Sequence, residues 1–216
     1  MPLLDIVIDV SDAQGTVHWG DVFAAGIRVA MIKATEGATF TAHTWAANSA
    51  GAKAAGLKVI PYHFMTNADP AAQAAHFRTT AALSPGAAYA LDWEKEVVGG
   101  HEITADAGQV DAVGAALAGP LGRNPLGYWG IPGSTPAGAV PTAFMGGWER
   151  WVPRYRDGAI SDFSRAGGHA SPFNPPGGTF LFWQYTAGGV VGGVGGAVDR
   201  SVALFAAEAD LIAWCG

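Results

Sequence analysis

Eight short apolar runs recur along this chain of 216 residues, and several of them end in a polar or aromatic residue. Continuous apolar runs of this length are typical of strands that are buried on both faces. With Asp9, Lys33, Tyr62 and Asp92 as the first four ends, the spacings (33 − 9, 62 − 33 and 92 − 62) are 24, 29 and 30 residues. This spacing fits a repeated strand and helix, because parallel neighbours need a crossover of a dozen or more residues. The eight predicted strands are Ile6–Asp9, Val29–Lys33, Val59–Tyr62, Ala88–Asp92, Leu126–Tyr128, Trp148–Tyr155, Phe180–Trp183 and Ala197–Asp199.

The connecting segments predict five helices. Residues 41–55 are rich in helix formers, and Gly56 follows as a C-terminal cap. Asp69 and Pro70 provide an N-cap acid and a first-turn proline for the next helix. The remaining helices are predicted over 19–25, over 104–118 with Thr104 at its start, and over 201–214.

The pattern changes after Tyr128. Residues 131–141 contain three prolines, residues 157–178 are rich in Gly, Ser and Pro, and residues 186–197 are mostly Gly, Val and Ala. None of these segments is suited to a crossover helix. The fold class is therefore predicted as α/β, an irregular TIM-like (β/α)5(β)3 barrel in which the last three strands lack crossover helices and include antiparallel pairs. Residues 1–216 are expected to form one domain.

Composition argues against several classes of partner. The formal charge is −6 and the twelve Lys and Arg residues form no run, so nucleic acid is not expected as a partner. No apolar stretch approaches the roughly 18 residues needed to cross a bilayer, so no membrane insertion is expected. The single Cys215 excludes an internal disulfide framework, and the six histidines show no pair at ligand spacing. We therefore expect neither a metal nor a cofactor.

Acidic residues stand at several of the predicted strand ends. Asp92 and Glu94 are two apart, so on an extended chain both side chains face the same way, with Cα atoms about 6.6 Å apart. Because active sites of such barrels lie at the carboxyl ends of the strands, Asp9 and Asp199 are expected to join this pair at one mouth. Clustered carboxyl groups raise one another's pKa, so that one can stay protonated as a general acid for glycoside hydrolysis. Aromatic residues able to stack on sugar rings lie near the same ends, namely Tyr62, Phe64, Trp93, Tyr128, Trp129, Trp151, Trp183 and Tyr185.

A series of short motifs resembles the lysozymes of glycoside hydrolase family 25, the muramidases of phages and bacteria. In chain order the motifs are Ile8-Asp9-Val10-Ser11 with Gln14-Gly15, Ile32-Lys33-Ala34-Thr35-Glu36-Gly37, Ala54 to Val59 leading to Tyr62-His63-Phe64, Leu91-Asp92-Trp93-Glu94, Trp151 with Tyr155, Phe182-Trp183-Gln184-Tyr185-Thr186, and Val198-Asp199. Each motif is short, but their order and spacing over nearly the whole chain are specific. One departure is Ala13, which stands where many members carry an aromatic residue before the Gln-Gly pair.

The resemblance implies hydrolysis of the β-1,4 bond between N-acetylmuramic acid and N-acetylglucosamine in the glycan strands of peptidoglycan. It implies that Glu94 is the general acid, that Asp92 assists through the substrate's acetamido group or the charged intermediate, and that Asp9 and Asp199 flank them. It also implies that further residues line or support the cleft: Lys33, Glu36, Tyr62, Tyr128, Trp151, Gln184 and Tyr185.

Several alternatives stay open on the sequence. A chitinase-like hydrolase also has a strand ending in Asp-x-Glu, and a glycan-binding barrel without catalysis would keep the same acids. The pattern leaves retaining, inverting and substrate-assisted stereochemistry undecided. We expect a monomeric catalytic domain without a wall-binding module, acting on the bacterial cell wall either as a phage endolysin released through a holin or as a secreted enzyme.

Overall fold

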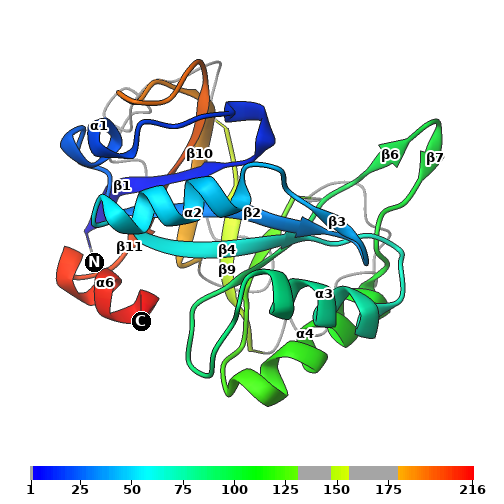
Figure 1. Cartoon of the computed structure of the whole chain (residues 1–216). Coiled ribbons are helices and arrows are strands. Elements are labelled where there is room, and N and C mark those ends of the chain that lie inside the picture. The colour runs from blue at the N-terminus through cyan, green and yellow to red at the C-terminus, as the bar shows by residue number, and fades with distance from the viewer. Residues whose placement is uncertain (1, 131–146, 156–179) are drawn as a thin grey trace.

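The structure, a computed structural model, describes residues 2–130, 147–155 and 180–216 (Figure 1). Strands and helices alternate along the first half of the chain, and strands dominate the second half. The strands are β1 (Leu3–Val10), β2 (Val29–Glu36), β3 (Phe40–Thr41), β4 (Lys58–Phe64), β5 (Ala90–Trp93), β6 (Val97–Val98), β7 (His101–Glu102), β8 (Leu126–Trp129), β9 (Glu149–Pro153), β10 (Phe182–Gly189) and β11 (Val198–Leu204). The helices are the 3-10 turn η1 (Asp12–Gln14) and α1 (Trp19–Ala24), α2 (Trp45–Ala54), α3 (Pro70–Thr80), α4 (Ala107–Leu121) and α6 (Glu208–Cys215).

Eight of the described strands close into a barrel. Their order is β1-β11-β10-β9-β8-β5-β4-β2, and β2 pairs with β1 to complete the circle, while the short β3 pairs only with β2. Neighbours from β1 through β2, β4, β5, β8 and β9 to β10 run parallel. β11 runs antiparallel to both β10 and β1. The predicted irregular α/β barrel with antiparallel pairing among its last strands is confirmed.

Alternating side chains separate the barrel interior from its outer surface. In β2, Val29 and Met31 belong to the interior cluster, whereas Ala30 and Ile32 pack outward with residues of the helices. One end of the barrel interior is filled by Phe205 together with Leu211 and Cys215 of α6. Figure 1 shows α6 and both termini at one end of the molecule, with β6 and β7 projecting at the other. The open end of the barrel is therefore the end where the parallel strands finish.

Capping residues explain where the first helices begin and end. Asp69 accepts a hydrogen bond from the Ala72 N–H and Pro70 follows it, as the sequence predicts for α3. Gly56, just after α2, has a φ of +93°, which fits the predicted glycine cap. α4 starts at Ala107, not Thr104, because Asp106 forms a capping box with Gln109.

Two predicted helices are too long. Residues 41–55 yield a helix only from Trp45, because Phe40 and Thr41 pair with β2 as β3. Residues 201–214 yield a helix only from Glu208, because Ser201 to Leu204 belong to β11. Pairing on both sides of β11 outweighs the helix propensity of this segment.

Other segments have no counterpart among the predictions or lie outside the described chain. β6 and β7 form a two-stranded hairpin with a Gly99-Gly100 turn, in which both glycines have positive φ. The segment at residues 157–178 and the proline-rich stretch at 131–141 lie outside the described residues. No helix in the described ranges is long and apolar enough to span a membrane.

Candidate active site

Asp92 and Glu94 lie at the carboxyl end of β5, between β4 and β8. Asp92 follows inward-facing Ala90, while Leu91 and Trp93 pack outward with the helices. Asp92 is 6% exposed, and its Oδ1 atom has no hydrogen-bond partner within the described part of the chain. Glu94 is only partly buried. The pair therefore offers one buried oxygen that lacks a donor and one carboxyl group that reaches the opening.

Asp9 and Asp199 face the same opening from β1 and β11. The two residues are direct partners in the antiparallel pairing of these strands. Asp199 is the second residue of β11, so its predicted place at a strand end is wrong. Because β11 runs against β1, its first residues lie at the same rim as the last residues of β1. The antiparallel strand thus brings Asp199 to the predicted mouth from the opposite direction.

Burial and mutual repulsion hold protons on this acid cluster. Burial raises the pKa of Asp92 well above its usual range, and the charge of Glu94 raises it further, whereas Lys33 opposes the shift. Burial also raises the pKa of Glu94, as does the charge of Asp199. The pKa of Asp9 is well above its usual range because of burial and the neighbouring Asp199, and that of Asp199 is raised by burial. Such a group can keep one carboxyl protonated near neutral pH, as a general acid requires.

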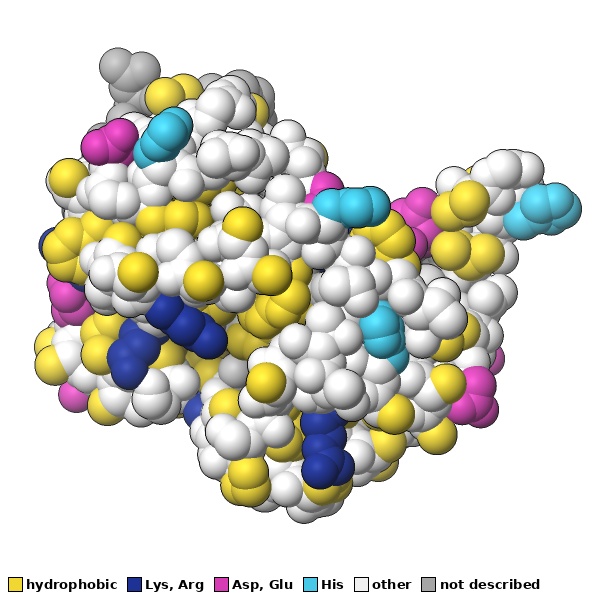
Figure 2. Space-filling view, viewed as in Figure 1, with side chains coloured by type: hydrophobic (Ala, Val, Ile, Leu, Met, Phe, Trp, Pro, Cys, Tyr) yellow, Lys and Arg dark blue, Asp and Glu magenta, His cyan; other side chains and the backbone are white. Residues whose placement is uncertain are grey.

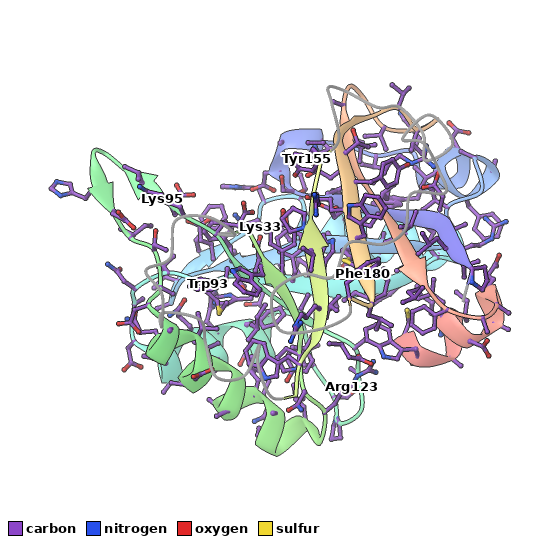
Figure 3. All side chains as sticks on the ribbon, turned by 180° about the vertical axis from the view of Figure 1, so that it is seen from behind. Lys33, Trp93, Lys95, Arg123, Tyr155 and Phe180 are labelled. Carbon is purple, nitrogen blue, oxygen red and sulfur yellow. The ribbon has the colours of Figure 1, made fainter. Side chains whose placement is uncertain are left out.

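One cation lies beside the acids. The Lys33 Nζ atom is 2.7 Å from an oxygen of Glu36 and 4.6 Å from the ring centroid of Phe64. Glu36 lies on β2 with Lys33, and Phe64 lies on the neighbouring β4. Lys33 also acts electrostatically on Asp92 and Glu94. Figure 3 shows Lys33 and Tyr155 toward one end of the barrel and Arg123 toward the other. Glu36 therefore holds the ammonium group at the rim of the cluster.

Buried aromatic rings form the floor beneath the acids. Trp151 packs edge-on against Tyr62 and Tyr128, with ring centroids 6.2 and 4.5 Å apart, and its indole N–H donates to Ser201 Oγ at 3.0 Å. All three rings belong to the interior cluster and are less than 10% exposed. Burial and the charges of Asp92 and Asp9 raise the pKa of Tyr62 well above its usual range, so its hydroxyl stays a donor. These rings fill the barrel interior next to the acids and expose little of their faces.

Gln184 joins β10 to the acid cluster. Its amide nitrogen donates to Asp9 Oδ2 at 3.0 Å, and its amide oxygen accepts from the hydroxyls of Tyr128 and Tyr155 at 2.8 and 2.7 Å. Tyr155 is absent from the residues that the sequence places in the cleft, although it occurs in one of the motifs. The inward position of Gln184 on β10 is the signal that links it to the mouth.

Tyr185 is not brought to the site with the other predicted residues. Its hydroxyl donates to Asp5 Oδ1 at 2.9 Å, and its ring packs with Trp183 in a cluster on the outer side of the barrel. Trp93 and Trp129 likewise pack outward, in the layer between barrel and helices. The reason is the two-residue period of a strand, which places Gln184 inside and Tyr185 outside.

Two further features surround the opening. Gly130 follows β8, and a Cβ built on it would lie 2.6 Å from Glu94 Cγ, a contact that no sequence pattern reveals. The β6–β7 hairpin begins three residues after Glu94 and carries the exposed side chains of Val97 and Val98. Figure 2 shows this hairpin standing clear of the body of the protein, with hydrophobic side chains along it. In the described ranges, no group of His, Cys, Asp and Glu side chains is arranged to hold a metal ion.

Comparison with known proteins gives consistent matches. The sequence profile of glycosyl hydrolases family 25 matches residues 8–194. Lysozyme M1 of Streptomyces globisporus is 31% identical over 203 residues, which cover 90% of this chain and 66% of that protein. The autolytic lysozyme of Clostridium acetobutylicum is 42% identical over 88 residues, so the match spans 40% of this chain and only 27% of that protein. The crystal structure of the bacterial lysozyme from Streptomyces coelicolor has a TM-score of 0.74 and 28% identity, over 96% of this chain and 95% of that one.

Proposed function

Because this chain belongs to glycosyl hydrolases family 25, we propose that it hydrolyses the β-1,4 bond between N-acetylmuramic acid and N-acetylglucosamine in peptidoglycan. The proposal takes residues 1–216 as one catalytic domain that works as a monomer. The similarity to two lysozymes supports a substrate in the bacterial cell wall. The observation that carries the assignment is the Asp92 and Glu94 pair at the end of β5, with an unpartnered buried oxygen on Asp92.

Glu94 is proposed as the general acid. Its raised pKa keeps a proton available, and its partial exposure lets it meet a glycosidic oxygen and regain a proton from water. Glu94 gives its proton to the leaving oxygen as the bond from that oxygen to the anomeric carbon breaks. The same carboxyl then takes a proton from the water that attacks the anomeric carbon. Glu94 therefore returns to its protonated form at the end of each cycle.

Asp92 is proposed to act through the acetamido group of the substrate. Its Oδ1 atom needs a donor, and an acetamido N–H supplies one. Holding this N–H turns the acetamido oxygen toward the anomeric carbon, where it forms a bond as the glycosidic bond breaks. Water then opens this cyclic intermediate and restores the acetamido group. Asp92 thereby stabilises the positive charge that the ring nitrogen carries in the intermediate.

The experiment combines cell-wall lysis with analysis of the cut ends. The protein is incubated with purified peptidoglycan, and the new reducing ends are identified by mass spectrometry. We expect muramic acid ends from the wild type and at least a 10³-fold loss of rate in Glu94→Gln and Asp92→Asn, since each removes a reacting group. Glu102→Gln is the matched control, because Glu102 lies on the exposed β7 and its carboxylate is 3.8 Å from the Lys95 ammonium group.

Each other outcome contradicts part of the proposal. Glucosamine ends would indicate a chitinase-like cut, and no new ends would indicate a glycan-binding barrel. Full activity of Glu94→Gln, with its fold intact by circular dichroism, would remove Glu94 from the role of acid. The route to the wall, either release through a holin as a phage endolysin or secretion, is a separate proposal that expression in a lysogen or a secreting host would decide.

A further inference from the structure

The side chain of Gln184 joins the acid cluster to two tyrosines through hydrogen bonds. Its side-chain oxygen has two lone pairs, and the hydroxyls of Tyr128 and Tyr155 occupy both at 2.8 and 2.7 Å. Because the oxygen faces the tyrosines, the amide nitrogen must face Asp9, where it donates at 3.0 Å. The two tyrosines therefore fix which end of the amide meets the carboxyl group.

This arrangement leaves Gln184 poorly suited to bind the substrate, which is the role that the sequence resemblance implies for it. The residue is 2% exposed, and its oxygen has no free lone pair. A sugar hydroxyl could donate to that oxygen only after one of the buried bonds had broken, and burial closes the amide nitrogen to the substrate as well. Asp9, the carboxyl group that the amide meets, is 6% exposed and pairs with the partly buried Asp199.

We propose that Gln184 is a positioning residue, which holds Asp9 in place beside Asp199 through an amide whose orientation Tyr128 and Tyr155 set. This inference rests on the proposed function, since it assigns a residue of β10 a positioning role in the proposed active site. The donated N–H stabilises the ionised form of Asp9 and acts against burial and against Asp199. The pair Asp9 and Asp199 can then share one proton.

Several charged or titratable groups face Asp9 from the surrounding strands, and each contributes to its titration. Asp199 on β11 raises the pKa of Asp9 most after burial, and Glu94 beyond β5 raises it further. Asp92 and the Tyr62 hydroxyl also interact with the charge of Asp9. The Lys33 ammonium acts on the neighbouring Asp92 and Glu94. Gln184 supplies the N–H donor that lowers the pKa of Asp9, whereas these acids raise it.

The decisive variant is Gln184→Met, which has a similar length, adds no charge and removes the amide that joins Asp9 to the two tyrosines. The apparent pKa of Asp9, followed by carboxyl ¹³C NMR and assigned with Asp9→Asn, should rise by about one pH unit or more. Hydrolysis of purified peptidoglycan should lose about tenfold in kcat with KM changed less than about twofold, and its pH profile should move to higher pH. Tyr155→Phe removes one of the two bonds that orient the amide, so it should shift the profile in the same direction by less.

Gln73→Met is the matched control, because Gln73 is fully buried and donates to the backbone oxygens of Thr66 and Ala68. It should lower the melting temperature and leave both the Asp9 titration and the pH profile of activity unchanged. An unchanged Asp9 titration in Gln184→Met would overturn the inference, and so would a rise in KM at constant kcat, which marks a substrate ligand. If the wild type cut no peptidoglycan, the proposed function would fail, while the NMR titration would still decide the role of Gln184.

Discussion

Replacing Gly130 by alanine should displace the carboxyl group of Glu94 without unfolding the barrel. An alanine Cβ would lie 2.6 Å from Glu94 Cγ and 2.9 Å from Tyr128 Cε1. Carbon atoms in contact settle at about 3.5 to 4.0 Å, so a group must move by about 1 Å. Tyr128 is 4% exposed and its hydroxyl is bonded to Gln184, which keeps the ring in place. The shift therefore falls on Glu94, which is only partly buried.

A displacement of this size in a catalytic group costs about 10²-fold in rate. We expect Gly130→Ala to lower kcat for peptidoglycan hydrolysis by about that factor, since the proton of Glu94 no longer meets the leaving oxygen. The φ of Gly130 lies outside the left-handed region, so alanine introduces no backbone strain there. The melting temperature should consequently change by only a few degrees.

Gly119→Ala provides the control for this experiment. Gly119 lies in α4 directly before Pro120, and a Cβ built on it meets no atom within 4 Å other than its chain neighbours, so alanine should leave kcat unchanged. Wild-type kcat in Gly130→Ala would refute the reasoning. A loss of activity that parallels a loss of folded protein would refute it as well, because the effect would then be one of stability.

Two further predictions concern buried titratable groups. Burial lowers the pKa of His63 to about 3, so between pH 6.5 and 3 the unfolded chain binds a proton that the folded chain does not. The free energy of unfolding contributed by His63 should thus be complete above pH 6.5 and fall by roughly 3 kcal/mol at pH 4. Urea unfolding of wild type and His63→Asn, above pH 6.5 and at pH 4, measures this contribution as the difference between their free energies of unfolding. The same loss of stability on acidification in both proteins would contradict the prediction. Burial raises the pKa of Cys215 to about 12, so the native thiol should react with a thiol reagent at pH 8 at least tenfold slower than in urea, and equal rates would contradict this.

The strand positions could be predicted because each barrel strand is covered on both sides. Runs such as Val29–Ile32 are apolar without interruption, since Val29 faces the interior cluster and Ala30 the helices. The spacing of the first four strand ends then predicts the parallel half of the barrel. Asp9, Asp92 and Glu94 follow from the same reasoning, because the ends of parallel strands meet at one rim.

The C-terminal part could not be predicted from local sequence in the same way. Ser201 to Leu204 read as the start of a helix, yet β10 and β1 offer hydrogen bonds on both edges and draw these residues into β11. The direction of β11 places Asp199 at the mouth, although it lies at the start of its strand. Strand direction depends on long-range pairing, and a run of seven residues does not encode it.

The side-chain contacts within the site could not be predicted from the sequence either. Tyr185 and Gln184 are neighbours with equally suggestive side chains, and only the register of β10 against β11 and β9 decides which one faces inward. Gly130 offers no chemical group at all, and its closeness to Glu94 follows from the pairing of β8 with β5. The contacts of such residues can be identified only once the pairing of the strands is known.

Burial separates the proposed roles of Glu94, Asp92 and Asp9. A general acid must recover its proton from water in every cycle, so it needs a path to solvent. Glu94 is partly exposed and meets this condition, whereas Asp92 and Asp9 are each 6% exposed and do not. A buried carboxyl group acts better as a fixed acceptor, because its position and partners stay constant through the reaction. The order of burial thus favours Glu94 as the proton donor, Asp92 as the acceptor for the acetamido group, and Asp9 as part of the frame that Gln184 holds.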